Sequence, residues 1–176
     1  MAGRAAGERL TREGAKNVLC VIQQPGHLGL AARCAGAAAT FAGSLRTLDV
    51  DGTRPSDVKA AIMARLQQDR SIDRVLTLSA PVALTTLEAA GEANSYAKVV
   101  TFDTNSAVIE AIKSGTIAWA VDQQPFLQGY LAVDSLWLYV TNKNVMGGGG
   151  PTLTGPSFVD GFNIDDVAER AKEGTR

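Results

Sequence analysis

Histidine, cysteine and aromatic residues are all scarce in this sequence. Its 176 residues include one histidine, two cysteines and 6% aromatic residues. The spacing of His27, Cys20 and Cys34 is not that of metal ligands. We therefore predict no metal site and no other cofactor. We expect the two cysteines to be separate, buried thiols, although a single disulfide between them is the alternative.

A strong net charge and a long apolar run are also missing. The formal net charge is −1 and the pI is about 5.8, which gives no reason to expect a nucleic-acid partner. No run approaches the roughly 18 apolar residues of a membrane span. The first ten residues, MAGRAAGERL, lack the apolar region of a secretory signal, so we expect a shortened start or a product that stays in the cytoplasm.

Apolar segments alternate with helical patterns along most of the chain. We predict five strands, at residues 18–22, 45–50, 75–78, 98–102 and 117–121. A helix precedes the first strand and further helices follow each of them, at residues 28–41, 57–68, 80–93, 106–113 and 125–140. With 45% apolar residues, the chain fits one α/β domain built on a parallel, doubly wound sheet of flavodoxin-like order.

Polar residues follow each predicted strand. In open α/β sheets this carboxyl edge is where small ligands bind. The carboxylates, amides and hydroxyls suit a sugar, whose hydroxyl groups both donate and accept hydrogen bonds. They show no nucleophile–base spacing, so we predict a binding protein rather than an enzyme. These residues are Gln23, Gln24, Asp51, Ser79, Asp103, Asp122 and Gln123.

Four glycines at residues 147–150 resemble a phosphate-binding loop only superficially. No strand precedes them and no Lys-Ser/Thr pair follows, so we interpret them as a flexible link. A flavodoxin-like nucleotide-binding domain therefore stays an alternative without a phosphate site.

Several segments resemble one protein family in the same order along the chain. They are SIDRVLTL at 71–78, VVTFD at 99–103 and DQQPFLQGY at 122–130, together with Arg33 and Gly36. These segments are similar to periplasmic sugar-binding proteins of the ribose/galactose-binding type, which serve ABC importers. The resemblance covers nearly the whole chain but only the second lobe of a family member.

The resemblance implies a three-layer lobe of a type I periplasmic binding protein. It implies a sugar ligand, an ABC permease as partner, and a periplasmic or membrane-associated extracellular location. We expect residues 1–123 to form the second lobe, and residues 124–176 to form a hinge-following helix, a Gly-rich link and a closing segment. A sugar-responsive transcription regulator is an alternative, but its helix-turn-helix and basic face are absent from the sequence.

The resemblance also implies roles for individual residues. Arg33, Asp103 and Gln123 match ligand-binding positions, while Ser79 stands where some members have asparagine. The alternatives are a surface arginine, a helix N-cap and a structural hinge bond, respectively. Possible further ligand contacts are Gln24, His27 and Asp51, although a lone histidine in a Pro-Gly loop usually makes only local hydrogen bonds.

The helix predicted at residues 125–140 has a wide apolar arc. In the family this helix packs on the first lobe. Without that lobe we expect it either to fold back on its own sheet or to pair with a second copy in a homodimer.

Overall fold

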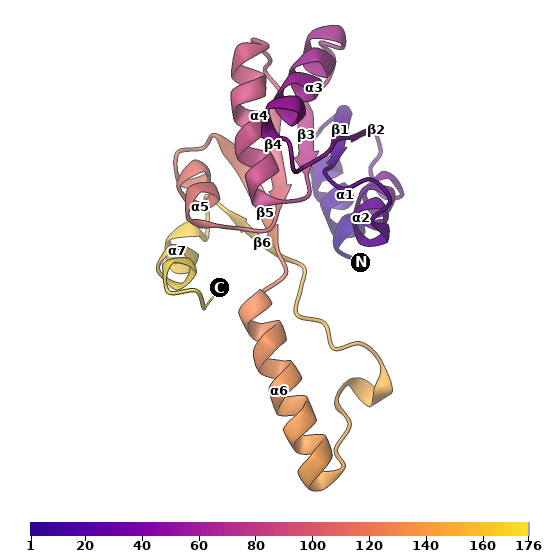
Figure 1. Ribbon diagram of the computed structural model, residues 1–176, viewed down its shortest axis with the longest axis vertical. Coiled ribbons are helices and arrows are strands. Elements are labelled where there is room, and N and C mark those ends of the chain that lie inside the picture. The colour runs from indigo at the N-terminus through magenta and orange to yellow at the C-terminus, as the bar shows by residue number, and fades with distance from the viewer. Residues whose placement is uncertain (176) are drawn as a thin grey trace.

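A computed structural model describes residues 1–175 and shows a central sheet with helices on both faces (Figure 1). The strand order is β2-β1-β3-β4-β5-β6, and all neighbours are parallel except the antiparallel pair β5–β6. This order confirms the predicted doubly wound α/β fold. The strands are β1 (Asn17–Ile22), β2 (Ser44–Asp49), β3 (Arg74–Thr77), β4 (Lys98–Phe102), β5 (Ile117–Asp122) and β6 (Ser157–Asp160).

Helices pack on the sheet in two layers. The first pair, α1 and α2, covers one face, and the other face is covered by α3, α4, α5 and α7. None of the helices in the described part of the chain is long and apolar enough to cross a membrane. The helices are α1 (Ala2–Arg12), α2 (Leu28–Ala38), α3 (Pro55–Gln68), α4 (Ala80–Glu92), α5 (Ser106–Lys113), α6 (Pro125–Asn142), the short 3-10 helix η1 (Met146–Gly149) and α7 (Ile164–Lys172).

Strand β1 illustrates why the inner strands are apolar along their whole length. Side chains of a strand point alternately to the two faces of a sheet, and here both faces are covered. Cys20 and Ile22 therefore pack under α1 and α2, while Leu19 and Val21 pack under α3 and α4. Burying one such aliphatic side chain contributes about 1.5–3 kcal/mol to folding.

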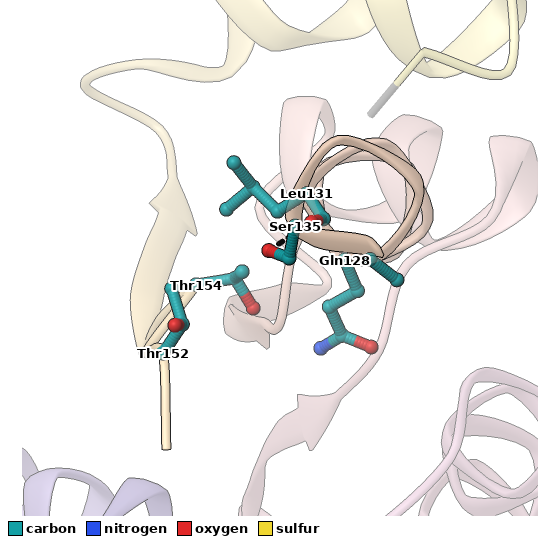
Figure 2. Close-up of a pocket in the computed structure, with 6 residues that line it drawn as sticks. Gln128, Leu131, Ser135, Thr152 and Thr154 are labelled. Carbon is teal, nitrogen blue, oxygen red and sulfur yellow. Dashed lines mark hydrogen bonds between the residues drawn. The ribbon is translucent and has the colours of Figure 1, made fainter. Parts of the chain in front are cut away.

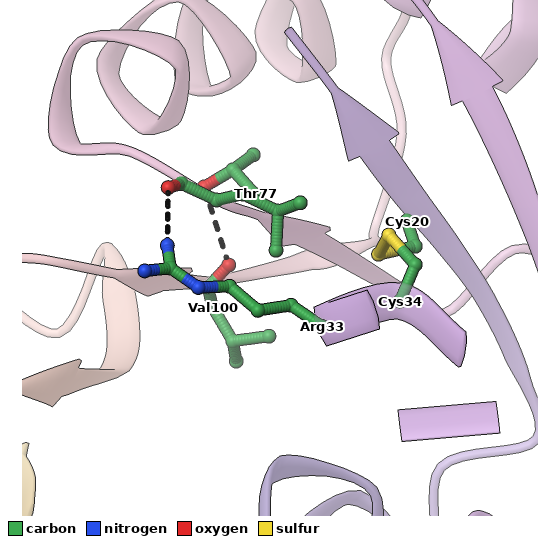
Figure 3. Close-up of a disulfide and its surroundings, with 6 residues drawn as sticks. Cys20, Arg33, Cys34, Thr77 and Val100 are labelled. Carbon is green, nitrogen blue, oxygen red and sulfur yellow. Dashed lines mark hydrogen bonds between the residues drawn. A yellow bond between two sulfur atoms is a disulfide. The ribbon is translucent and has the colours of Figure 1, made fainter. Parts of the chain in front are cut away.

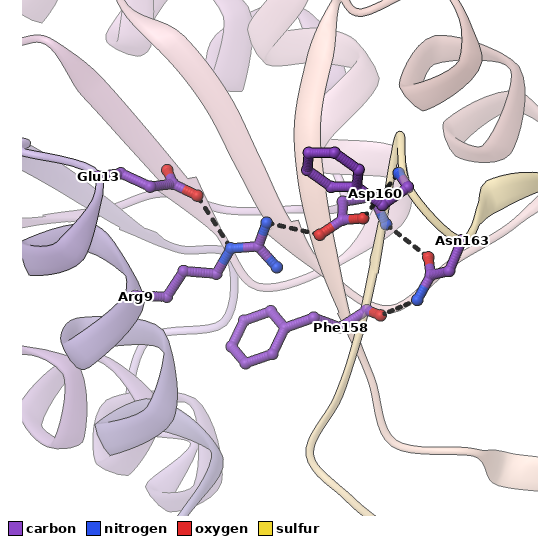
Figure 4. Close-up of polar contacts among 6 residues, drawn as sticks. Arg9, Glu13, Phe158, Asp160 and Asn163 are labelled. Carbon is purple, nitrogen blue, oxygen red and sulfur yellow. Dashed lines mark hydrogen bonds and ion pairs between the residues drawn. The ribbon is translucent and has the colours of Figure 1, made fainter.

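The closing segment adds a strand that the sequence analysis did not predict. Strand β6 pairs antiparallel with β5, and Ser157 lies opposite Asp122. Arg9 of α1 ties β6 to the body, because its Nη2 lies 2.7 Å from Asp160 Oδ2 (Figure 4). The same guanidinium stacks over the Trp119 and Phe158 rings at 5.1 and 4.8 Å. The edge strand is thus held by charge and packing as well as by its ladder.

Cys20 and Cys34 form a disulfide, so the prediction of two separate thiols was wrong (Figure 3). Both residues are buried, and their Cα atoms are 6.0 Å apart, within the usual range for a disulfide. The pairing arises because α2 lies across β1 and turns Cys34 toward the sheet. A separation of 14 residues along the chain does not reveal this contact.

Helix α6 projects away from the sheet, and a strap at residues 143–156 leads back to β6 (Figure 1). No residue of α6 is buried, so the helix does not fold back on its own sheet as one of our two hypotheses had it. One of its faces carries large apolar side chains at alternating spacings of four and three residues, as in a coiled-coil seam. These exposed residues are Phe126, Tyr130, Val133, Trp137 and Val140.

Candidate functional site

The ends of the neighbouring strands β4 and β5 bring two predicted site residues together. Phe102 pairs with Val121, so Asp103 and Gln123 follow at the same edge of the sheet. Asp103 has a left-handed backbone with φ of 63°, a conformation that aspartate tolerates better than most residues. Gln123 Nε2 donates a hydrogen bond of 2.7 Å to Asp103 Oδ1.

Arg33 reaches this pair from α2, one of the two helices that cover one face of the sheet. Its Nη2 donates to Gln123 Oε1 at 2.9 Å, and its Nη1 lies 3.4 Å from the carbonyl oxygen of Leu78. The guanidinium carbon sits 5.0 Å from the centre of the Phe102 ring, in cation–π contact. Arg33, Gln123 and Asp103 thus form one hydrogen-bonded row, here called the polar chain.

Ser79 lies at the same edge, after β3, and is partly exposed. It is the N-cap residue of α4, but its side chain makes no capping hydrogen bond. Its carbonyl oxygen accepts a hydrogen bond of 3.3 Å from Thr101 Oγ1, and Thr101 in turn bonds Thr77 inside the sheet. The main chain of Ser79 is therefore anchored, while its side chain is partly exposed.

The remaining predicted residues make their hydrogen bonds within their own loops. His27 caps α2, since its Nδ1 accepts from the Leu30 amide at 3.3 Å. The backbone oxygen of Gln24 accepts from the His27 amide at 3.1 Å, and the Gln24 side chain is exposed.

Asp51 closes a turn after β2. Its Oδ1 accepts from the Thr53 hydroxyl at 2.6 Å and from the Thr53 amide at 3.0 Å. These two hydrogen bonds, followed by the Arg54 guanidinium, lower the pKa of the Asp51 carboxyl below its usual value. The carboxylate is thus engaged locally, apart from the polar chain.

The structure adds polar residues around Gln123 that the sequence analysis did not single out. Gln128 Nε2 and Thr154 Oγ1 each donate to the Gln123 carbonyl oxygen at 2.9 Å, and the Gln124 side chain donates to the Thr154 carbonyl. Gln124 itself has a left-handed backbone with φ of 56°. The DQQP sequence marked this place as a hinge, but the strap residue Thr154 comes close only through the tertiary fold.

A pocket of about 200 Å³ lies between α6 and the returning strap (Figure 2). Hydroxyl and amide groups of both segments line it beside aliphatic side chains. The lining residues are Gln128, Leu131, Ala132, Ser135, Thr152 and Thr154.

The chemistry of the polar chain fits a neutral, hydroxyl-rich ligand. It offers guanidinium and amide donors, and carboxylate and amide acceptors, on partly exposed side chains. Such alternation matches hydroxyl groups that donate and accept at once. Within residues 1–175, no three histidine, cysteine, aspartate or glutamate side chains gather as a metal site would require.

Solved structures share this architecture. A carbohydrate transporter from Acidothermus cellulolyticus 11B, crystallised in complex with myo-inositol, is 50% identical with a TM-score of 0.94. The alignment covers 99% of this chain and 61% of that chain, so this chain spans less than two thirds of its relative. A comparison with curated proteins gave no match.

More distant structures agree in fold. The myo-inositol binding protein of Caulobacter, bound to myo-inositol, is 22% identical with a TM-score of 0.72, and the alignment covers 97% of this chain and 60% of that one. A periplasmic ribose ABC transporter from Conexibacter woesei DSM 14684 is 20% identical with a TM-score of 0.81, covering 98% and 60%.

A family model described as a periplasmic binding protein domain matches residues 1–144. This match covers all five parallel strands and the whole of α6, and it agrees with the resemblance seen in residues 122–130. The chain therefore belongs to the periplasmic binding protein family, whose members among its structural relatives are sugar-binding components of ABC transporters.

Proposed function

We propose that this chain supplies one side of the binding cleft of a substrate-binding protein for an ABC importer. The polar chain of Arg33, Gln123 and Asp103 carries the proposal, because it sets donors and acceptors in a fixed row at the carboxyl edge of the sheet. Ser79 completes this edge, and Gln24, His27 and Asp51 are further candidates in the loops beside it. The function is solute binding without catalysis.

The ligand class that we infer is a cyclic polyol of the myo-inositol type. The relative that is 50% identical was crystallised with myo-inositol, and the residues of this chain suit a ring bearing hydroxyls on every carbon. In this proposal Arg33 and the Gln123 amide donate to ring hydroxyls, whereas Asp103 accepts from two of them.

The polar chain forms one wall of a site rather than an enclosure. Proteins of this architecture bind between two lobes that close by hinge rotation. We propose residues 1–123 as the second lobe, followed at 124–176 by the hinge helix, link and closing segment. With one wall, we expect polyol affinity in the millimolar range or weaker, which corresponds to about −4 kcal/mol.

A titration monitored by heteronuclear NMR tests the proposal, because it detects millimolar affinity. We expect myo-inositol to shift the Arg33 and Gln123 side-chain signals, and Asp103→Ala to remove the effect. The matched control is Asp165→Ala, which removes an exposed carboxylate on α7. If myo-inositol, ribose, arabinose and allose all leave the spectrum unchanged, the polyol function of this chain is wrong.

The proposed role in an ABC importer also implies a partner and a location. We propose an ABC permease as the partner and a periplasmic or membrane-associated extracellular location for the working protein. The alternatives, a sugar-responsive regulator and a nucleotide-binding domain, gain no support from the relatives, which are transport components. Recovery of a permease by the wild-type protein from a native membrane preparation would support this partner, and recovery of none would count against it.

The exposed face of α6 supports a second proposal, a homodimer of this chain. Val133, Trp137 and Val140 are 67%, 61% and 68% exposed on a face spaced like a coiled-coil seam. Pairing with the same face of a second copy would remove this apolar surface from water. Sedimentation equilibrium over a wide concentration range tests it, and a monomer at the highest concentration would refute it.

A further inference from the structure

The disulfide lies one residue from the polar chain. Cys34 directly follows Arg33 on α2, and Cys20 is in the middle of β1 (Figure 3). The bond joins residues 14 positions apart and closes a segment that contains the loop at the carboxyl end of β1 and the first half of α2. Covalent closure of this segment restrains the helix that carries Arg33.

Few large side chains hold α2 against the sheet. Its buried residues are Leu30, Cys34 and Ala37, and the first residue of the helix, Leu28, is 85% exposed. Leu30 is therefore the one large apolar side chain that α2 buries. Dispersion and apolar burial scale with contacting area, so small side chains leave a helix weakly fixed in position.

Helices α1 and α2 approach each other closely at two glycines. Gly3 of α1 lies against the Arg33 backbone, and a Cβ atom there would overlap the Arg33 carbonyl. Gly36 faces the same crossing, where its Cβ would lie 3.2 Å from the Arg4 amide nitrogen. The two glycines permit this close approach without adding a large side chain that would fix the position of α2 along α1.

The Arg33 side chain depends on the position of its helix. Its three contacts belong to three different strand ends: the Leu78 carbonyl after β3, the Phe102 ring on β4 and the Gln123 amide after β5. A shift of α2 by about 1 Å would lengthen the 2.9 Å bond to Gln123 beyond normal hydrogen-bond distance.

We propose that the Cys20–Cys34 disulfide positions Arg33 for ligand binding, in addition to any effect on stability. This inference rests on the proposed polyol function. Loss of the disulfide weakens polyol binding about tenfold, because a charge-assisted hydrogen bond from Arg33 to the ligand is lost or misdirected. The disulfide is a positioning group, and Arg33 is the residue through which it acts.

A mutant cycle with NMR titration of myo-inositol tests this. The variants are Cys20→Ala/Cys34→Ala, Arg33→Ala and all three substitutions together. We expect the disulfide-free variant to bind about tenfold more weakly, and the triple variant to bind no more weakly than Arg33→Ala alone. Unchanged binding without the disulfide, or losses that add in the triple variant, would overturn the proposal.

Leu66→Ala separates positioning from general destabilisation. Leu66 is fully buried on α3, in the core on the opposite face of the sheet, so its loss lowers stability without reaching the polar chain. We expect it to leave polyol affinity unchanged. Equal weakening by Leu66→Ala would show that the disulfide acts only through stability. If Cys20→Ala/Cys34→Ala does not fold, Cys20→Val/Cys34→Ala restores core volume in its place.

A readout without ligand distinguishes failure of this proposal from failure of the polyol function. The Arg33 Nε–H signal senses the Phe102 ring, and the Gln123 side-chain amide senses both of its partners. If wild type binds no polyol, the proposed function fails. The positioning proposal still requires both signals to move when the disulfide is removed, and unchanged signals would refute it.

Discussion

Replacing Gln123 by glutamate should make the stability of the protein depend on pH in a new way. The Gln123 amide bridges a donor and an acceptor: Arg33 lies 2.9 Å from its oxygen, and Asp103 lies 2.7 Å from its nitrogen. Glutamate has the same shape but places a second carboxylate oxygen where the nitrogen donates now. Two carboxylates then face each other at hydrogen-bond distance.

The magnitude follows from these distances. Two unit charges about 4 Å apart interact with about 4 kcal/mol at an effective dielectric constant near 20. The Arg33 guanidinium stays beside the other oxygen and offsets much of this repulsion. With the lost amide hydrogen bond included, we expect Gln123→Glu to lower the free energy of unfolding by about 1–2 kcal/mol at pH 7.

The sign of the pH dependence separates this mechanism from simple loss of a contact. The neighbouring carboxylate raises the pKa of the introduced carboxyl group above its unfolded value of about 4.3. A protonated carboxyl restores a donor, so the destabilisation is small below about pH 4 and grows as the pH rises through the raised pKa.

Urea unfolding between pH 4 and pH 7 measures this, with each variant compared with wild type at the same pH. Gln123→Leu is the control, because it removes the same hydrogen bonds without adding a titrating group. Its difference from wild type should vary much less with pH. If Gln123→Glu also differs from wild type by a constant amount, the reasoning about the polar chain is refuted.

Three further predictions concern the edge strand, the exposed helix and a loop. Asp160→Ala should lower the free energy of unfolding by about 1–2 kcal/mol, because it removes one of the two carboxylates that pair with the part-buried Arg9 and leaves only Glu13. Glu92→Ala, at an exposed ion pair, should cost clearly less in the same urea titration, and equal costs would contradict this. Trp137→Glu should abolish self-association in sedimentation equilibrium while changing monomer stability by less than about 0.5 kcal/mol, and self-association that persists would show that α6 is not the interface. Thr53→Val should raise the pKa of Asp51 toward 3.8 in a carboxyl NMR titration, since the Thr53 hydroxyl is the main cause of its lowering. Because that pKa is lowered in the folded state, the stability it contributes is present at neutral pH and is lost as the pH falls below about 4; an unshifted titration would contradict the assignment.

The fold class follows from the order of elements along the chain. Continuous apolar strands such as Val18–Ile22, separated by helices with short loops, specify a parallel sheet covered on both faces, because an apolar run without alternation needs two buried faces. Polar residues after each strand located the candidate edge, since parallel strands share one carboxyl end. The hinge sequence at 122–130 indicated the family.

Which of the polar residues contact one another depends on the tertiary structure. Asp103 and Gln123 meet because β4 and β5 are neighbours in register, and Arg33 joins them from a helix above the sheet. His27 and Asp51 follow strands in the same way, yet each bonds within its own loop. Local sequence cannot distinguish these outcomes, because they depend on which strand ends lie side by side.

The pairing of the two cysteines and the exposure of α6 could not be predicted from the sequence either. Cys20 and Cys34 pair because α2 crosses β1 at the right place, which is a property of helix–sheet packing and not of cysteine spacing. The apolar pattern of α6 can be seen in the sequence. Such a pattern indicates only that one face of the helix is apolar, and it does not say what covers that face. That this face lies exposed, away from the sheet, was decided by the path of the chain after the hinge.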